Sequence, residues 1–280
     1  MSYRSVFRPD LLRGQVHLVT GGGTGIGRAI AHELSALGAT VVLAARREEP
    51  LEAVAEELRA AGGEALTKTA NVREAEEVEA LIAFVQERCG ALQGLVNNAG
   101  GQFLSPASEI SPNGWRSVID LNLTGTFLMS RAAYRTFFAE HGGAIVNIVS
   151  EMWRGFPGMA HSGAARAGVV NLTQTLAVEW AEQGVRVNAV APGIILSSGL
   201  DTYPESARSF LDEIASDVPA KRFGTVSEVA AGVTYLLSPA ATYVSGETLR
   251  IDGAASLWRK TWPIDPHESW PTYDAFEEDA

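Results

Sequence analysis

Seven short runs of apolar or β-branched residues recur along the chain and predict buried strands. These runs are Val16–Thr20, Thr40–Ala44, Ala65–Thr69, Gly94–Asn97, Ala144–Ile148, Val185–Val190 and Thr248–Ile251. Between them lie amphipathic stretches, among them Arg28–Leu37, Pro50–Ala61, Glu74–Arg88 and Arg166–Glu182. The apolar residues of Glu74–Arg88 recur at helical spacing, so they share one face. Strands alternating with helices predict an α/β fold with a doubly wound, mostly parallel seven-stranded sheet and helices on both faces.

Residues 1–255 are predicted to form a single domain, because no internal repeat, low-complexity tract or interdomain linker interrupts this alternation. Residues 256–280 differ, since they hold tryptophans at 258, 262 and 270, three prolines and an acidic end. This tail either covers a neighbouring subunit or wraps its own, and the sequence does not decide between the two.

Composition narrows the class of protein. The chain is 46% hydrophobic and 20% charged, which is typical of a soluble globular protein. Its net charge of −11 argues against a nucleic acid or an anionic membrane as partner. It shows no signal peptide and no apolar run near the ~20 residues that span a bilayer. The single cysteine, Cys89, excludes an intrachain disulfide. We therefore expect a cytoplasmic location, and no metal site is predicted.

A glycine-rich loop follows the first predicted strand and leads directly into the first helix. Glycines permit a tight turn and let backbone N–H groups approach a pyrophosphate, and the helix N-terminus adds donors and a favourable dipole. This position, between strand and helix, makes the loop a predicted nucleotide-binding cradle. Its candidate contact residues are Gly21, Gly23, Thr24, Gly25 and Ile26.

The second predicted strand ends in Arg46-Arg47. An acidic residue at this point would hydrogen-bond the ribose 2′-hydroxyl of NAD(H), but none is present. Two arginines can instead make bidentate contacts with a 2′-phosphate. The sequence therefore predicts NADP(H) as the cofactor.

Four motifs, in order along residues 14–253, resemble the short-chain dehydrogenase/reductase family. They are Thr-Gly-x-x-x-Gly-Ile-Gly at 20–27, Asn97-Asn98-Ala99-Gly100, Asn122 within Asn-Leu-Thr-Gly-Thr-Phe, and Pro192-Gly193. The resemblance implies a Rossmann-type NADP(H)-binding oxidoreductase that forms a homotetramer. It also implies that Asn98, Ala99 and Gly100 line the cofactor, that Asn71 and Val72 lie beside the adenine, and that Pro192, Gly193 and Ile194 lie near the nicotinamide carboxamide. Asn122 would hold a water or bend its helix, or it would only satisfy backbone groups.

The chain departs from that family at the catalytic pair. The family's Tyr-x-x-x-Lys is replaced by Ser162 and Arg166, which still share a helix face at i and i+4. A serine without an assisting base is a poor acid or base at pH 7, whereas Arg166 can still bind ribose hydroxyls. Ser150 falls near the family's substrate-orienting serine. His161 is the nearest candidate proton donor, although it can equally be a supporting hydrogen bonder.

The stretches 98–106 and 161–168 are similar to the peroxisomal trans-2-enoyl-CoA reductase branch, and the pattern also resembles bacterial citronellol/citronellal dehydrogenases. Three readings follow: an enoyl-thioester reductase, an alcohol or aldehyde dehydrogenase on a branched hydrophobic substrate, and a nucleotide-binding protein with little turnover. Alkene reduction is favoured, because it needs donors for an oxyanion rather than a base on a hydroxyl. A CoA thioester would need a basic rim, for which Arg154 or the pair Lys221-Arg222 are candidates. Residues 194–218 are expected to close over the substrate.

Overall fold

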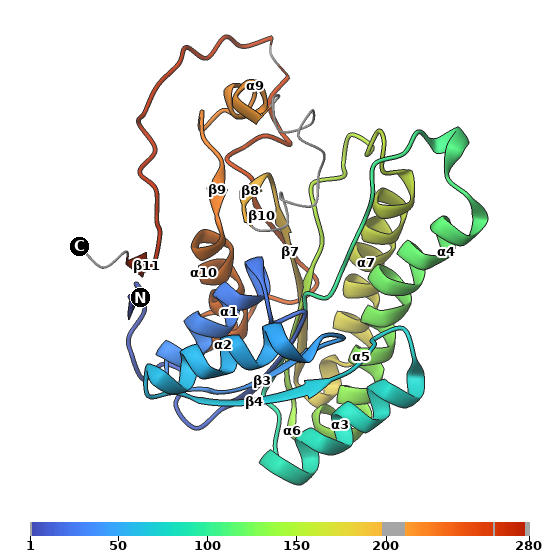
Figure 1. The fold of residues 1–280 in the computed structure, drawn as a ribbon, viewed down its shortest axis with the longest axis vertical. Coiled ribbons are helices and arrows are strands. Elements are labelled where there is room, and N and C mark those ends of the chain that lie inside the picture. The colour runs from blue at the N-terminus through green and yellow to red at the C-terminus, as the bar shows by residue number, and fades with distance from the viewer. Residues whose placement is uncertain (1, 198–210, 260, 278–280) are drawn as a thin grey trace.

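A computed structural model describes residues 2–197, 211–259 and 261–277 of the chain (Figure 1). Seven parallel strands form one sheet in the order β10-β7-β6-β5-β2-β3-β4. These strands are β2 (Val16–Thr20), β3 (Thr40–Ala45), β4 (Glu64–Thr69), β5 (Gly94–Asn97), β6 (Gly143–Ile148), β7 (Val185–Pro192) and β10 (Thr248–Ile251). The predicted doubly wound fold is confirmed, and each of its seven strands contains one of the seven apolar runs, with ends that differ by at most two residues. The strand order reverses between β2 and β5, which is where ligands bind in sheets of this kind.

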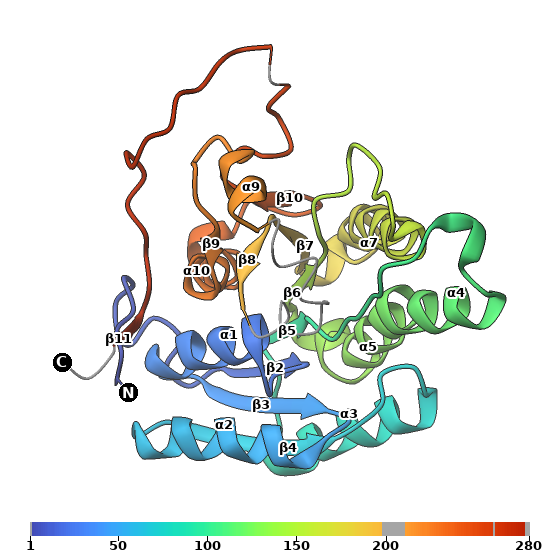
Figure 2. The ribbon, with the colours of Figure 1, turned by 45° about the horizontal axis from the view of Figure 1, so that its top comes forward.

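Helices cover both faces of the sheet (Figure 2). Apolar residues of α1 (Gly25–Ala36), α2 (Glu48–Ala60) and α10 (Val226–Leu237) join one hydrophobic cluster with the strands. Residues of α3 (Ala75–Cys89), α5 (Gly125–Ala133) and α7 (Ala160–Glu179) join a second cluster on the other face. The shorter elements are α4 (Pro112–Ile119), α6 (Ala139–His141), α9 (Leu211–Ser216), two π-helical turns at Asp120–Thr124 and Tyr134–Phe138, and 3-10 turns at Ala107–Glu109, Ala181–Gln183 and Pro239–Ala241.

The amphipathic stretch Arg166–Glu182 covers only part of its helix. α7 begins at Ala160, six residues earlier, so it includes Ser162, as the shared helix face of Ser162 and Arg166 requires. Gly163 and Gly168 weaken the helical pattern there, and both are needed for close packing. A Cβ on Gly163 would lie 2.9 Å from Phe156, and one on Gly168 would lie 2.9 Å from Leu123.

Two small sheets lie outside the main one. β8 (Ile195–Leu196) pairs in parallel with β9 (Gly224–Thr225), beyond the carboxyl end of β7. β1 (Ser2–Tyr3) pairs antiparallel with β11 (Phe276–Glu277), so the described ends of the chain meet beside α1 (Figure 1). The C-terminal tail thus runs back along its own chain. Residues 198–210 of the segment expected to close over the substrate lie outside the described residues. None of the described helices is long and apolar enough to cross a membrane.

A buried polar network ties helices on one face to the centre of the sheet. The Asn97 amide donates to Ser130 Oγ at 2.9 Å and to Asn147 Oδ1 at 2.8 Å. The Asn147 amide in turn donates to Thr173 Oγ1 at 2.9 Å. Because all four side chains are buried, each of these bonds satisfies a group that water cannot reach. The network therefore holds α5 and α7 in a fixed register on β5 and β6.

We predict that Thr173→Val destabilises the protein by about 1–3 kcal/mol, since it leaves the buried Asn147 amide without its acceptor. The measurement is urea unfolding of the variant beside the parent. Thr175→Val is the matched control, because the Thr175 hydroxyl is exposed and donates only to Asn171 O in its own helix. Equal midpoints for the two variants would mean that the buried network adds nothing to stability.

Candidate active site

The carboxyl ends of β2 and β5 are joined through Thr20 and Asn98. Thr20 Oγ1 accepts from the backbone N–H groups of Asn98 and Ala99, each at 3.0 Å. The Asn98 side-chain amide donates to Thr20 O at 2.9 Å and to Gly21 O at 3.1 Å. These four bonds cross the point where the strand order reverses. They fix the glycine-rich loop and the Asn97–Gly100 motif against each other.

Close packing accounts for two glycines of the predicted cradle. Gly21 has φ +65°, and a Cβ on it would lie 2.9 Å from the Asn98 amide nitrogen. A Cβ on Gly27 would lie 2.1 Å from Gly21 O, so a larger residue would push the helix off the loop. Thr24 is the N-cap of α1 but makes no side-chain cap bond. The first-turn N–H groups are therefore not capped by that side chain, as a phosphate-binding helix end requires.

The residues expected to meet the adenosine half of a cofactor lie at the carboxyl ends of β3 and β4. Arg46 and Arg47 are exposed, and neither forms an ion pair with any residue that the structure describes. The Asn71 backbone N–H donates to the Glu77 carboxylate at 2.8 Å, and its side-chain oxygen accepts from Arg73 Nε at 3.1 Å. Val72 is buried. The two exposed arginines are thus open to an anion.

Arg166 lies in the second turn of α7 and is buried. Its Nη1 donates to Ile148 O, and its Nε is buried without a hydrogen-bond partner. Burial lowers the pKa of Arg166 to about 10, so the guanidinium stays charged at neutral pH. A Cβ on Gly100 would lie 2.4 Å from Arg166 Nη2. The guanidinium therefore occupies the space that glycine at position 100 leaves open.

Asn122 lies in the π-helical turn between α4 and α5 and is fully buried. Its amide nitrogen donates to Gly101 O at 2.8 Å and to Val118 O at 2.9 Å, and its oxygen accepts from Gly101 N at 3.1 Å. The side chain therefore clamps the loop that carries Gly100 and Gly101. Of the three roles expected for Asn122, satisfaction of backbone groups and a local change of helix geometry are the two visible here.

Ser162 and His161 meet a residue that the sequence did not single out. Ser162 Oγ donates to Gln102 Oε1 at 2.7 Å, and the Ser162 N–H donates to His161 Nδ1 at 2.7 Å. The His161 ring packs edge-on to Phe103, 4.3 Å between centroids, and its Nε2 is buried without a hydrogen-bond partner. Burial lowers the pKa of His161, which favours the neutral ring. Gln102 lies in the stretch 98–106, which resembles the trans-2-enoyl-CoA reductase branch, but the sequence assigns no role to it.

Ser150 and Pro192–Ile194 are the remaining predicted site residues, and they lie at the carboxyl ends of β6 and β7. Ser150 Oγ is buried and has no hydrogen-bond partner, and the residue lies two positions after Ile148, whose carbonyl binds Arg166. The Gly193 N–H donates to Ile251 O at 2.9 Å, and Ile194 O accepts from the Gly224 N–H at 3.0 Å. Three buried polar atoms without partners, Ser150 Oγ, His161 Nε2 and Arg166 Nε, thus lie on the ends of β6 and α7. This arrangement suits a polar ligand.

The expected basic rim is only partly available. Lys221 Nζ donates to Ser216 O at 2.6 Å and lies over the Trp258 ring at 4.6 Å. Arg222 forms an ion pair with Glu228 at 2.6 Å. Both cations are therefore engaged by their own chain, whereas Arg154 is exposed. The assignment of Lys221-Arg222 to a phosphate rim is not supported by these contacts.

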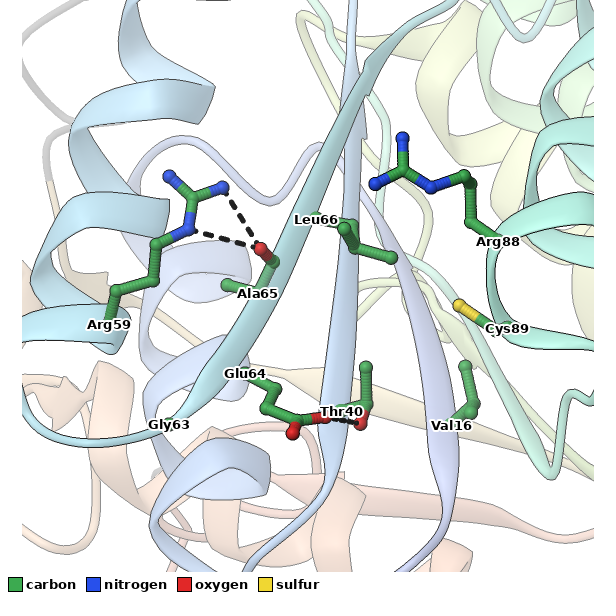
Figure 3. Close-up of a pocket in the computed structure, with 9 residues that line it drawn as sticks. All are labelled: Val16, Thr40, Arg59, Gly63, Glu64, Ala65, Leu66, Arg88 and Cys89. Atoms are coloured by element: carbon green, nitrogen blue, oxygen red, sulfur yellow. Dashed lines mark hydrogen bonds between the residues drawn. The ribbon is translucent and has the colours of Figure 1, made fainter.

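A separate hollow of about 540 Å³ lies at the opposite edge of the sheet (Figure 3). It is lined by the amino-terminal ends of β2, β3 and β4 and by Arg59, Arg88 and Cys89. Arg59 donates to Ala65 O, and burial raises the pKa of the Cys89 thiol. Ligands of doubly wound sheets bind at the carboxyl ends of the strands. This hollow is thus distinct from the candidate active site.

Known proteins with similar sequences and structures point to one family. A family profile described as Enoyl-(Acyl carrier protein) reductase matches residues 21–255. The peroxisomal 2,4-dienoyl-CoA reductase [(3E)-enoyl-CoA-producing] of Mus musculus is 40% identical over 257 residues, which are 90% of this chain and 87% of the relative. The solved citronellol catabolism dehydrogenase of Pseudomonas aeruginosa is 50% identical, with a TM-score of 0.82 over 91% of this chain and 100% of that one. An actinorhodin polyketide ketoreductase solved with NADPH is 36% identical, with a TM-score of 0.81 over 87% of this chain and 98% of that one.

Proposed function

The chain belongs to the short-chain dehydrogenase/reductase family, and we propose that this oxidoreductase uses NADPH to reduce the conjugated C=C bond of a trans-2-enoyl thioester. The observation that carries the proposal is the catalytic pair. Ser162 is hydrogen-bonded to Gln102, and Arg166 lies beside Gly100, where the family normally has tyrosine and lysine. This pair can supply hydrogen bonds and positive charge but no ready acid or base at the substrate oxygen.

The residues present fit a nicotinamide dinucleotide. Glycine at position 21 lets the loop lie against Asn98, glycine at position 100 admits the Arg166 guanidinium, and Arg166 Nε is an orphaned buried donor. When bound, the cofactor would supply the hydride. The residues proposed to hold it are Gly21, Gly23, Thr24, Gly25 and Ile26 at the pyrophosphate, Arg46 and Arg47 at the 2′-phosphate, Asn71 and Val72 at the adenine, Asn98, Ala99, Gly100 and Arg166 at the nicotinamide ribose, and Pro192, Gly193 and Ile194 at the carboxamide.

The chemistry asked of the protein is stabilisation of an oxyanion. Reduction at the β-carbon of an enoyl thioester places negative charge on the thioester oxygen. The Ser150 hydroxyl, which has no partner, is one proposed donor to that oxygen. The Ser162 hydroxyl is the other, and it would turn its single proton from Gln102 Oε1 to the substrate oxygen. A proton from water at the α-carbon completes the reaction, and His161, whose neutral ring is favoured by burial, would relay that proton rather than hold it beforehand. Asn122 is proposed to act indirectly, by holding the loop of Gly100 and Gly101 in place.

The proposal is tested by two assays on one purified protein. NADPH oxidation with a trans-2-enoyl-CoA is expected to proceed faster than NADP⁺ reduction with citronellol. Turnover with the alcohol alone would contradict the proposed reaction and leave the family assignment intact. Tight NADPH binding without turnover in either assay would favour the third reading, a nucleotide-binding protein.

An alcohol or aldehyde dehydrogenase acting on a branched hydrophobic substrate is the second candidate function. Two observations favour it: the 50% identity to the citronellol catabolism dehydrogenase, and the engagement of Lys221 and Arg222 by their own chain. An uncharged terpenoid needs no basic rim. In this reading the neutral His161 ring would take the hydroxyl proton on Nδ1, its accepting nitrogen, which would first give up its bond from the Ser162 N–H.

We predict that Arg46→Ser/Arg47→Ser weakens NADPH binding by about 10–100-fold and changes NADH binding little, because charge-assisted bonds to a phosphate contribute about 1.5–3 kcal/mol. The measurement is titration of each nucleotide by calorimetry. Arg13→Ser removes an exposed arginine from the other edge of the sheet and serves as the control. Equal affinities of the unaltered protein for NADH and NADPH would disprove the cofactor assignment.

Assembly and location stay predictions. Phe127 on α5 and Val178 on α7 are large apolar side chains with exposed fractions of 42% and 78%, which suits the helix-to-helix contacts expected of a homotetramer. A cytoplasmic location rests on the sequence alone.

A further inference from the structure

The C-terminal tail lies beside a segment that precedes it by a constant number of residues. His267 Nε2 donates to Pro219 O at 3.0 Å, Arg222 Nε donates to Trp270 O at 3.2 Å, and the Ala275 N–H donates to Ser227 Oγ at 3.0 Å. The partners in these three bonds are each 48 residues apart. Constant separation means that residues 267–275 run parallel to residues 219–227. We call residues 261–277 the C-terminal strap.

Arg222 is the central link between the strap and the rest of the chain. Its Nη2 donates to Pro271 O at 2.8 Å and to Glu228 Oε1 at 2.6 Å, and its Nη1 donates to Glu228 Oε2 at 3.0 Å. Glu228 also accepts from the Thr225 N–H in the capping box that begins α10. One guanidinium thus joins two strap carbonyls to the first turn of α10. Arginine suits this place because its donors form a rigid planar fork.

The far end of the strap is fixed to α1. Phe276 packs against His32 at 5.1 Å and Tyr3 at 4.8 Å between centroids, and Arg28 lies over its ring at 4.6 Å. Strand β11 pairs with β1 at the same place. At the near end, Trp258 lies just before the strap; its Nε1 donates to Trp262 O at 2.8 Å, and Lys221 Nζ lies over its ring at 4.6 Å. The strap is therefore held on both sides of its contacts with residues 219–227.

The segment under the strap leads directly to the candidate active site. β9 pairs with β8, and the Gly224 N–H donates to Ile194 O, one residue after the Pro192-Gly193 motif. Lys221 has φ 56°, a left-handed conformation that a non-glycine residue keeps only where its surroundings hold it. Two contacts hold Lys221 in this conformation: its amine donates to Ser216 O at the end of α9, and the same amine lies over the Trp258 ring. β8 directly follows Pro192–Ile194, the residues proposed to contact the nicotinamide carboxamide. A shift of residues 219–225 would therefore move β8. We call β8 and β9 together the β8–β9 wall.

We propose that the C-terminal strap positions the β8–β9 wall of the substrate site, and that Arg222 is the positioning residue through which it acts. In the described part of the chain, Arg222 is hydrogen-bonded neither to a proposed cofactor residue nor to Gln102, His161 or Ser162, and its segment is linked to Ile194 through the backbone bond of Gly224. We therefore expect its main effect on substrate binding. The kinetic part of this inference rests on the proposed function. Hydrogen exchange of residues 219–228 gives a readout that does not.

The test compares Arg222→Gln and a chain ended after Pro263 with the unaltered protein. Both variants are expected to raise the substrate KM about tenfold, the effect of losing about one charge-assisted hydrogen bond, while the NADPH Kd stays within about twofold. Amide exchange in residues 219–228 should become faster in both. Trp262→Ala is the matched control within the strap, because its side chain is 76% exposed, and it should leave all three readouts unchanged. Arg222→Lys, which keeps the charge without the fork, should restore KM partly.

Three results would overturn the inference: unchanged exchange in residues 219–228, faster exchange with unchanged KM, or equal losses in substrate and NADPH binding. The ended chain guards against an Arg222→Gln variant that fails to fold, since it leaves the Arg222–Glu228 ion pair in place. Absence of turnover in the unaltered protein would count against the proposed function alone, because the exchange measurement still tests whether the strap holds this segment.

Discussion

Arg166→Ala should lower kcat/KM by about 10²–10⁴-fold and weaken NADPH binding. The guanidinium is buried and donates to Ile148 O, its Nε has no hydrogen-bond partner, and its Nη2 lies beside Gly100. Each charge-assisted hydrogen bond contributes about 1.5–3 kcal/mol, so the loss of two corresponds to about that range of rates. Alanine would also leave a cavity next to the loop of Gly100. The measurement is steady-state kinetics together with a nucleotide titration.

Two further variants separate the role of Arg166 from a general loss of stability. Arg166→Lys keeps the charge and restores the side chain usual for the family, so it should retain activity within about tenfold of the unaltered protein. Arg131→Ala removes an exposed arginine from α5 and should change neither rate nor binding. If Arg166→Ala kept both its NADPH affinity and its rate, the guanidinium would be a structural group only.

The sheet could be predicted from the sequence because buried parallel strands are continuous apolar runs. The runs Val16–Thr20 and Gly94–Asn97 match their strands residue for residue, and the glycine loop after the first one marked the switch point. Each of these signals is local. A strand that is buried on both faces, or a turn that needs glycine, can be recognised from a few consecutive residues.

Contacts between distant residues could not be predicted in the same way. The Ser162–Gln102 bond joins residues 60 positions apart, and no periodicity indicates it. The strap is extended and offers mainly backbone carbonyls to Arg222, so its sequence carries no helix or strand pattern. The same limit applies to the start of α7, where Gly163 and Gly168 serve packing against Phe156 and Leu123 at the expense of helix propensity.

Ser162→Ala should lower kcat for enoyl-thioester reduction by about 10²–10³-fold with a smaller effect on KM. Removal of one oxyanion donor typically has an effect of this size, because the donor bonds more strongly to the developing charge than to the ground-state carbonyl. Ser162 Oγ is buried and oriented by Gln102, so little water is available to replace it. The measurement is kcat and KM with a trans-2-enoyl-CoA at saturating NADPH.

His161→Gln is the variant that decides between the two reactions. In alkene reduction water can supply the α-proton, so this change should lower kcat less than about tenfold. In alcohol oxidation a base must take the hydroxyl proton as the hydride leaves, and the loss of His161 should lower the rate by about 10²–10⁴-fold. Burial lowers the pKa of His161. In the unaltered enzyme the ring would therefore stay neutral, and able to accept a proton, down to a lower pH than an exposed histidine would. A large loss in His161→Gln beside a small loss in Ser162→Ala would therefore reject enoyl reduction, because it would show that proton removal, and not oxyanion stabilisation, limits the reaction.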